Sequence, residues 1–350
     1  MQRVLVTGGC GFIGANLALE RLRRGDAVRL LDNCLRSGSE RNLWLLERQA
    51  EADRLSLAPG DIRDPECVEY ALRDVDLVFH LAAQVAVTTS IAEPRADFEV
   101  NALGTLNVLE AARLSPRPPI VVYASTNKVY GSLDALDVRL EKDHYVLPQL
   151  EYGVNEDLPL DLHSPYGCSK GSADQYVIDY GRIYGLPTVV FRQSCIYGPL
   201  QHGNEDQGWV AHFANRALAD EGVTIYGDGF QVRDLLYVGD LLEAFDLATK
   251  HIDTTRGRAY NIGGGPRNAV SIIECIRLLE ELIGRRIRTE HDGWRSGDQR
   301  AYVSDVRRAF EDFGWAPRVG IPEGLKTLLA WLATNAADSD ARVTVGGAKR

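Results

Sequence analysis

The chain has 350 residues, a formal net charge of −10, and 45% hydrophobic and 25% charged residues. A chain of this length can bury a large core, and we expect it to form two lobes. The acidic balance argues against a nucleic-acid partner, and no apolar run approaches the roughly 20 residues that cross a bilayer. The chain begins directly in an apolar strand, with no room for a signal peptide, so we expect a cytoplasmic protein with no membrane partner.

Residue types that bind metals or form disulfides show no pattern. The six cysteines form no C-x-x-C pair and have no regular spacing, and the seven histidines are scattered. We therefore expect reduced thiols, no disulfide framework and no metal site. Cys10 is interpreted as a small residue at a variable position of the glycine turn, Cys168 as no catalytic nucleophile, and His80 as a packed core residue.

The first predicted strand, 3–7, runs into a T-G-x-x-G-x-x-G turn at residues 7–14. Its glycines allow a sharp turn, a close approach of backbone amides to a pyrophosphate, and tight packing of the helix expected at 12–24. Asp32 ends the next strand, where a carboxylate would accept hydrogen bonds from the adenosine ribose and disfavour a 2′-phosphate. This context predicts NAD as the cofactor, in preference to NADP.

Strands and helices then alternate along the first half of the chain. The expected strands are 3–7, 27–32, 55–58, 77–81, 120–125 and 188–192. This alternation predicts an α/β fold with a doubly wound parallel sheet (Rossmann). We expect this domain to span 1–195 with an insertion at 132–163.

The later part of the chain is less regular, with helices expected near 208–221, after Asp240 and near 271–284. We expect 196–336 to form a smaller C-terminal substrate-binding α/β lobe that can return one strand to the main sheet. Residues 337–350 lack apolar periodicity and are expected to be a flexible tail.

Parallel strands bring their carboxyl ends to one edge of the sheet, where ligands bind. The third strand is followed by an acidic residue that we place beside adenine, and the fourth by small residues against which the cofactor can lie. The residues that this pattern assigns to the cofactor are Gly8, Gly11, Gly14, Asp32, Asp61, Ile62, Leu81, Ala82, Ala83 and Gln84.

Two later segments carry the chemistry. The strand at 120–125 ends in hydroxyl residues that lead to Thr126, and Tyr166-x-x-x-Lys170 opens an expected helix with both side chains on one face. A lysine cation near the tyrosine hydroxyl, with the positive nicotinamide ring, should lower the phenol pKa from about 10. Tyr166 would then act as the base for a sugar hydroxyl, with Thr126 sharing the hydrogen bond.

With these motifs in this order, residues 1–335 resemble the extended short-chain dehydrogenase/reductases that modify nucleotide sugars. The resemblance implies Thr126, Tyr166 and Lys170 as catalytic residues. It adds to the cofactor site Phe12, Ile13, Asn33, Arg36, Asn101, Ser125, Tyr166, Lys170 and Gln193. It implies as substrate-binding residues Thr89, Ser90, Asn127, Cys195, Tyr226, Arg233, Arg295 and Asp298. The arginines suit the diphosphate because the guanidinium binds phosphate oxygens in a bidentate way.

The two residues after Thr126 indicate the branch of the family. The 4,6-dehydratases carry an Asp-Glu pair there for water elimination, and this chain has Asn127-Lys128. The stretch 125–131, with 84–90, 163–171 and 206–210, resembles the CDP-paratose 2-epimerase (CDP-tyvelose epimerase) branch. That resemblance implies transient oxidation at C2 of a nucleotide-diphosphate hexose, reorientation of the 2-keto sugar, and reduction from the opposite face.

Three alternatives stay open at this point. A C2-epimerase of a GDP- or UDP-linked hexose and a nucleotide-sugar 4-epimerase would share the same catalytic residues. An NAD(H)-binding sensor would keep the fold but would have no use for a complete proton-transfer set. We also expect a homodimer, because relatives often pair through helices that correspond to those near 95–113 and 166–184.

Overall fold

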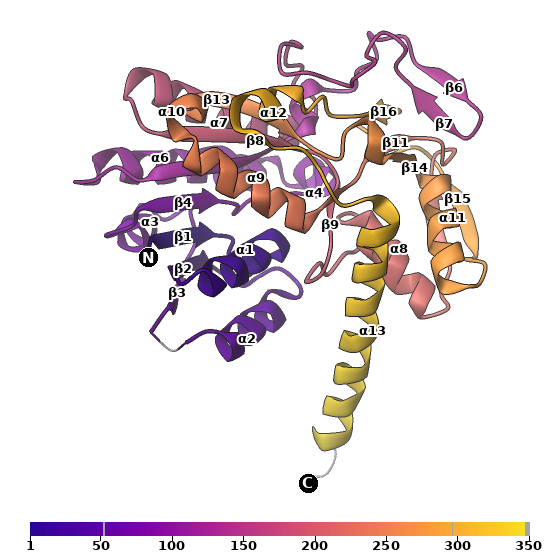
Figure 1. The fold of residues 1–350 in the computed structure, drawn as a ribbon, viewed down its shortest axis with the longest axis horizontal. Coiled ribbons are helices and arrows are strands. Elements are labelled where there is room, and N and C mark those ends of the chain that lie inside the picture. Colours follow the sequence, from indigo (N-terminus) through magenta and orange to yellow (C-terminus); the bar gives the residue numbers. More distant parts are fainter. Residues whose placement is uncertain (52, 296, 347–350) are drawn as a thin grey trace.

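The computed structural model describes residues 1–51, 53–295 and 297–346, with side chains described up to residue 334. Its main sheet has seven parallel strands in the order β13-β8-β5-β4-β1-β2-β3 (Figure 1). Their bounds are β1 Arg3–Thr7, β2 Ala27–Asp32, β3 Leu55–Pro59, β4 Leu77–His80, β5 Ile120–Thr126, β8 Thr188–Gln193 and β13 Arg258–Ile262. The fold class is the doubly wound α/β sheet that the alternation of strands and helices predicts.

Alternating side chains of the strands bury the two faces of this sheet against different helices. Val4 and Val6 point into one apolar cluster with helices α1, α2, α9 and α12, and Leu5 points into the other with α3, α6 and α7. The bounds of these helices are α1 Phe12–Arg23, α2 Ser39–Gln49, α3 Pro65–Leu72, α6 Gly104–Leu114, α7 Ser164–Ile183, α9 Val238–Lys250 and α12 Arg307–Phe313. Since both faces are covered, the strands are mainly apolar, and the ligand-binding edge is the carboxyl edge.

Short elements connect this layer to the rest of the chain. The π-helix η1, Glu99–Leu103, joins α5 (Pro94–Phe98) to α6, and α4 (Val87–Ala92) precedes α5. The insertion at 132–163 carries a hairpin of β6 (Arg139–Glu141) and β7 (His144–Val146), seen at the upper right of Figure 1. Its leucines pack on a small apolar cluster around Val129 and Tyr130.

The C-terminal lobe is built on a third apolar cluster, shared by α8 (Trp209–Leu218), α11 (Ile272–Ile283) and α13 (Ile321–Gly346). Short ladders complete it: β9 with β12, β10 with β15, and β14-β11-β16. The bounds of these strands are β9 Ile196–Tyr197, β10 Val223–Tyr226, β11 Val232–Asp234, β12 Leu236–Tyr237, β14 Ala269–Ser271, β15 Thr289–Asp292 and β16 Ala301–Tyr302. The remaining helix, α10, spans Ile252–Thr255.

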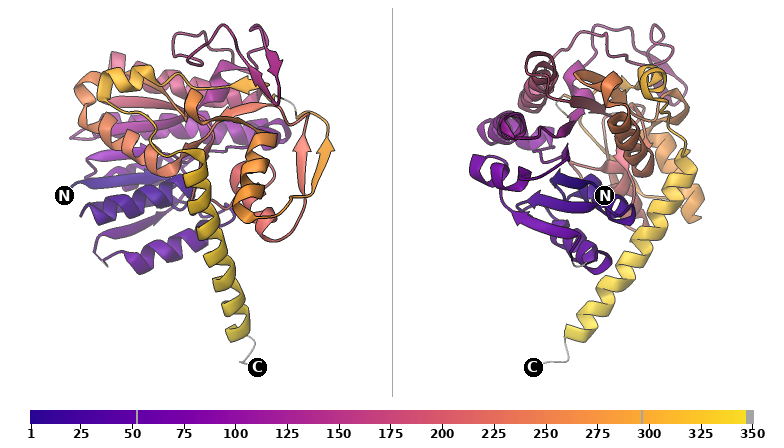
Figure 2. Two further views of the ribbon diagram at one scale, coloured as in Figure 1. Left: turned by 45° about the vertical axis from the view of Figure 1, so that its right-hand side comes forward. Right: turned by 60° about the vertical axis from the view of Figure 1, so that its left-hand side comes forward.

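The strand β13 enters the main sheet from this later part of the chain, next to β8. Helix α13 extends away from the body in all views (Figures 1 and 2). Helical backbone continues to Gly346, where the sequence suggested a tail without regular structure. Residues 347–350 of the expected tail lie outside the described residues, and the flexibility of the tail stays a prediction.

No helix in the described part of the chain is both long enough and apolar enough to cross a membrane.

Candidate active site

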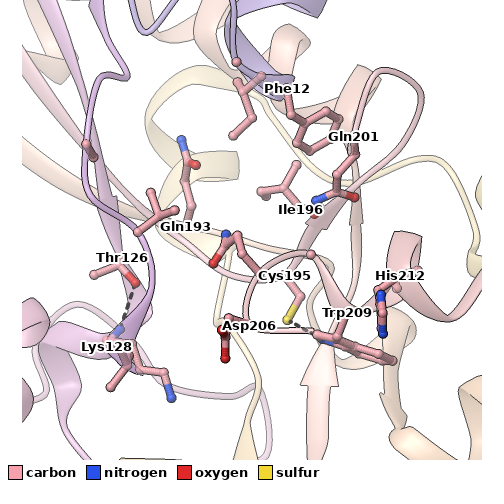
Figure 3. A pocket seen from close by; sticks show the side chains of 18 of the residues that line it. Phe12, Thr126, Lys128, Gln193, Cys195, Ile196, Gln201, Asp206, Trp209 and His212 are labelled. Carbon is pink, nitrogen blue, oxygen red and sulfur yellow. Dashed lines mark hydrogen bonds between the residues drawn. The ribbon is translucent and has the colours of Figure 1, made fainter. Parts of the chain in front are cut away.

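A cavity of about 430 Å³ lies between the carboxyl edge of the main sheet and the C-terminal lobe. Its wall includes the glycine turn after β1, the ends of β4, β5 and β8, the start of α7, and residues of α8, β10 and β11. Segments separated by up to 290 residues therefore meet at one cavity (Figure 3).

The expected residues fall into two groups with respect to this cavity. The cofactor residues in the wall are Gly8, Gly11, Phe12, Ile13, Gly14, Arg36, Leu81, Ala83, Ser125, Tyr166, Lys170 and Gln193. The substrate residues in the wall are Asn127, Cys195, Tyr226, Arg233, Arg295 and Asp298, and Thr126 is there too. The expected residues outside the wall are Asp32, Asn33, Asp61, Ile62, Ala82, Gln84, Thr89, Ser90 and Asn101.

The glycine turn presents the N-terminus of α1 to the cavity. Gly11 is the N-cap residue, and no side chain of the described residues caps this helix end. Gly8 has a φ of +69°, which glycine adopts at no steric cost. A Cβ on Gly14 would lie 2.3 Å from the carbonyl oxygen of Gly8, so only glycine lets the helix approach the turn this closely. The uncapped amides and the helix dipole suit a pyrophosphate.

Asp32 stands behind this turn rather than in the cavity wall. Its carboxylate accepts hydrogen bonds from the backbone amides of Cys10 (2.9 Å) and Cys34 (2.8 Å). At the outer edge, Asn33 donates to Asp61 at 3.0 Å. Hydrogen bonds from Arg63 hold the pKa of Asp61 below its ordinary value. The acidic groups expected at the adenosine are thus anchored by the protein itself.

Gln193, at the end of β8, provides a direct test of whether the cavity fits a dinucleotide. Its side-chain Nε2 is buried in the wall and finds no hydrogen-bond partner among the described residues. A buried donor without a partner costs free energy, which a carbonyl or phosphate oxygen of a ligand would recover. Together with the uncapped end of α1, this orphaned amide fits a bound NAD.

The catalytic candidates come together at the start of α7 and the end of β5. Tyr166 is only 8% exposed, and a hydrogen bond links it to Thr126. Burial raises the pKa of Tyr166 to about 12, against the lowering effects of Thr126 and Arg36. The expected lowering by Lys170 is therefore wrong for the protein alone, because burial outweighs the nearby charges.

Burial also shifts the pKa of Lys170. Its ammonium group donates to the carbonyl oxygen of Ala124 at 2.6 Å and lies 4.2 Å from the ring centre of Tyr123. Burial lowers the pKa of Lys170 to about 7, although Asp174 and Asp97 oppose the shift. Burial therefore favours the neutral form of Lys170, as it favours the neutral form of Tyr166.

A buried polar network supports the loop that follows β4. The Asn101 side chain accepts from the Gln84 amide at 2.9 Å and donates to the Gln84 carbonyl at 3.0 Å. It also contacts Asp97 and Ser169. Asn101 and Gln84, which the sequence assigned to the cofactor, therefore hold the loop from behind, and their direct contact with NAD stays a prediction.

The segment 87–90 is placed differently from the sequence expectation. Thr89 is exposed on α4, and Ser90 is buried with its hydroxyl on the carbonyl oxygen of Val87. Val87 and Thr88 line the cavity instead. The helical turn of α4 decides which of these neighbours faces inward, and the sequence pattern alone does not reveal it.

Asn127 and Lys128 enter the wall from the short 3₁₀ helix η2 (Asn127–Tyr130), which Thr126 caps by accepting from the Lys128 amide (Figure 3). Asn127 donates to Gln299 at 3.2 Å. The Lys128 ammonium donates to the carbonyl oxygen of Gly297 at 3.0 Å, and burial lowers its pKa to about 8. Lys128 helped to indicate the branch of the family from the sequence, but it was not among the expected site residues.

Cations gather on the side of the cavity formed by the C-terminal lobe. Arg233 is held by Asp298 at 2.6 Å and by the carbonyl oxygen of Gln299 at 2.8 Å. The Arg295 guanidinium lies 3.7 Å from the ring centre of Tyr226. Asp298 therefore orients Arg233, and the two arginines can meet an anion in the cavity of an otherwise acidic protein.

Cys195 lines the same region, and its sulfur accepts a hydrogen bond from the indole nitrogen of Trp209 at 3.5 Å (Figure 3). Burial raises the pKa of this thiol. Trp209 and His212, both on α8, also line the wall and were not expected there. The resemblance of the stretch 206–210, which contains Trp209, was the sequence signal that could have indicated this part of the wall.

The interpretation of His80 is confirmed. Its ring lies between the hydroxyls of Thr7 (2.7 Å) and Thr105 (2.9 Å), and burial lowers its pKa to about 3. A neutral, doubly hydrogen-bonded imidazole in the core has a packing role.

Comparisons with known proteins identify the family. The family model "GDP-mannose 4,6 dehydratase" matches residues 5–328. The chain belongs to the extended short-chain dehydrogenase/reductases that act on nucleotide sugars. CDP-paratose 2-epimerase of Salmonella typhi is 40% identical over 341 residues, which cover 95% of this chain and 100% of that protein.

Solved structures agree with this family. UDP-glucose 4-epimerase of Thermotoga maritima, solved with UDP-glucose, has a TM-score of 0.82 and 31% identity over 95% of this chain and 99% of its own. The Thermus thermophilus UDP-glucose 4-epimerase, solved with NAD, has a TM-score of 0.79 and 34% identity over the same shares. Within the short-chain dehydrogenase/reductases, this chain is an NAD-dependent nucleotide-sugar epimerase.

Proposed function

We propose that this enzyme inverts C2 of a nucleotide-diphosphate hexose of the CDP-paratose and CDP-tyvelose type, with NAD tightly bound and regenerated in each turnover. The observation that carries the proposal is the chemistry of the two residues after Thr126, Asn127 and Lys128. Asn127 is held by Gln299, and Lys128 by Gly297, so an amide and an ammonium group occupy this part of the wall. The 40% identity to a CDP-paratose 2-epimerase supports the same choice.

Elimination of water needs an acid and a base beside the oxidised carbon. Neither Asn127 nor Lys128 supplies a carboxyl group, so dehydration lacks its usual machinery here. An epimerase needs only one proton-transfer group, because the same hydroxyl proton is removed and later returned. Tyr166 with Thr126 is sufficient for that transfer.

Separate residues of the cavity wall would bind the substrate, orient it and transfer its proton. Tyr166, as the tyrosinate, accepts the proton of the C2 hydroxyl, and Thr126 orients that hydroxyl through a shared hydrogen bond. Bound NAD would supply the hydride chemistry at C2, in both the oxidation and the reduction. Arg233 and Arg295 hold the diphosphate while the 2-keto sugar turns. The expected NAD contacts are those in the cavity wall, with Gln193 and the amides of α1 foremost.

Inversion at C4 is the main alternative, because solved 4-epimerases share the fold at 26–34% identity. A C2-epimerase of GDP- or UDP-linked hexoses is the second. The sensor alternative is set aside, since the complete set of Thr126, Tyr166 and Lys170 lines a cavity in a chain that belongs to an enzyme family. The cytoplasmic location stays a prediction.

Proton NMR of a panel of CDP-, GDP- and UDP-linked hexoses, incubated with the enzyme without added NAD, tests the proposal. We expect inversion at C2 of a CDP-linked 3,6-dideoxyhexose, with no need for free cofactor. Inversion at C4 would contradict the proposal and identify a 4-epimerase. Turnover that depends on added NAD would show that the cofactor does not stay bound.

The Tyr166→Phe variant tests the base. We expect the turnover number to fall by about 10²–10⁴-fold, the usual contribution of a general base, while NAD and nucleotide-sugar binding persist. Calorimetric titration with the nucleotide sugar separates this result from loss of binding. A near wild-type rate would assign the proton transfer to another group.

A further inference from the structure

Two cysteines far apart in the sequence are brought together by the register of the main sheet. β1 and β2 are parallel neighbours, with Thr7 paired to Leu31. Cys10 and Cys34 each lie three residues beyond this pair, so the two thiols leave the sheet side by side. A disulfide needs a Cα separation of roughly 4.4–6.8 Å, and parallel neighbouring strands bring the segments that follow them into this range of approach.

One carboxylate holds both cysteines in place. Asp32 accepts from the amide of Cys10 with one oxygen and from the amide of Cys34 with the other. The two sulfurs and a carboxylate oxygen of Asp32 all lie within 4.8 Å of one another. Cys10 is fully buried in the glycine turn and Cys34 is half-buried, so an oxidant can reach the pair from the Cys34 side.

We propose that Cys10 and Cys34 form an oxidant-sensitive dithiol, and that their disulfide weakens the binding of NAD. Cys10 lines the cavity between Gly8 and Gly11, and Asp32 is the carboxylate assigned to the adenosine ribose. Formation of the bond draws two sulfurs that lie within 4.8 Å of each other to about 2.05 Å, and so moves both segments that Asp32 joins.

The oxidation balances with a peroxide as the oxidant. The Cys34 sulfur attacks one peroxide oxygen, giving a sulfenic acid and releasing the other oxygen as water. The Cys10 sulfur then attacks the Cys34 sulfur, the S–S bond forms, and the sulfenic oxygen leaves as a second water. Two thiols lose two electrons and two protons, and hydrogen peroxide is reduced to two molecules of water.

Proximity, rather than thiol acidity, favours this reaction. Burial raises the pKa of both thiols, so each is a weak nucleophile near neutral pH. We therefore expect slow oxidation that a bound dinucleotide slows further, because NAD would cover the turn that contains Cys10.

The test oxidises the full-length protein with hydrogen peroxide, with and without excess NAD and with a chelator present, and maps the peptides by mass spectrometry. We expect a cross-linked peptide containing Cys10 and Cys34, lighter by two hydrogen atoms and reversed by dithiothreitol, that forms more slowly with NAD. Titration calorimetry should show NAD affinity reduced about tenfold after oxidation, as for the loss of one charge-assisted hydrogen bond.

Matched variants separate this pair from the other thiols. Cys34→Ser should abolish the cross-link and make NAD affinity insensitive to peroxide. Cys67→Ser removes another half-buried thiol of the same domain and should change neither result. A cross-link between other cysteines, thiol loss that appears only without the chelator, or unchanged NAD affinity after Cys10–Cys34 oxidation would each overturn the proposal. Peptide mapping and NAD titration need no nucleotide sugar, so neither result depends on the substrate proposed above.

Discussion

At the scale of single residues, burial decides the protonation of the catalytic groups. Tyr166 and Lys170 lie one helical turn apart, yet the protein alone raises the pKa of the first to about 12 and lowers that of the second to about 7. Both shifts favour the neutral form, as desolvation demands. The reactive tyrosinate therefore depends on charge that arrives with the cofactor and on Thr126.

The depressed pKa of Lys170 has a consequence for stability. Its folded pKa of about 7 lies below the ordinary value of 10.5, so between these values the unfolded chain binds a proton that the folded chain does not. The unfolding free energy should then rise with pH from 7 to 10, by up to about 1.4 kcal/mol per unit. Below pH 7 both states are protonated and this gain is absent.

Urea unfolding of wild type and Lys170→Met at pH 7, 8 and 9 measures this slope. We expect the stability of wild type relative to the variant to increase with pH. Lys250→Met, at an exposed lysine paired with Asp246, serves as control and should follow wild type. Identical pH profiles for wild type and Lys170→Met would show that Lys170 keeps an ordinary pKa.

At the scale of elements, one buried ion pair joins the pieces that carry the catalytic residues. Asp174 of α7 accepts from Arg192 of β8 at 2.9 and 3.0 Å and from the Ser125 hydroxyl of β5 at 2.7 Å. Asp174 is therefore the point at which α7, β8 and β5 are held in register. Arg192 also donates to the hydroxyl of Tyr130, which extends the network to η2.

Arg192→Met should destabilise the protein by about 3–5 kcal/mol, because it leaves the Asp174 carboxylate buried without its partner. The double variant Arg192→Met with Asp174→Leu should recover part of that loss, since no unpaired charge remains. Urea unfolding at pH 7 measures both. A loss below about 1 kcal/mol for the single variant, as for a surface pair, would contradict this role.

At the scale of the whole molecule, we propose a homodimer formed through α6 and α7. Large apolar side chains are exposed on these helices and directly before or after them: Phe98, Leu103, Leu114, Tyr176, Ile183 and Tyr184. An exposed apolar surface of this kind commonly marks a protein–protein interface.

Light scattering coupled to size-exclusion chromatography tests the assembly. We expect twice the chain mass for wild type, and half of that for Tyr176→Asp with Ile183→Asp, because two carboxylates would be buried in an apolar interface. Phe310→Asp changes an equally exposed aromatic residue on α12 and should leave the mass unchanged. A monomeric wild type would refute the proposal.

The sequence by itself determined the parts of this protein that rest on local rules. The six strands predicted at 3–192 match the observed ones within one residue at each end, because alternating apolar runs and glycine turns need only their neighbours. The glycine turn, Thr126 and Tyr166 were found in the same way and meet at one cavity.

Only the tertiary structure decided what depends on distant partners. It identified β13 as the strand that returns to the sheet, tied Arg233 to Asp298, and turned Val87 and Thr88 rather than Thr89 and Ser90 into the cavity. It also set Cys10 beside Cys34. It also reversed the expected pKa shift of Tyr166, because burial depends on the whole fold. Strand pairing and desolvation arise from residues far apart in the chain, so no local pattern encodes them.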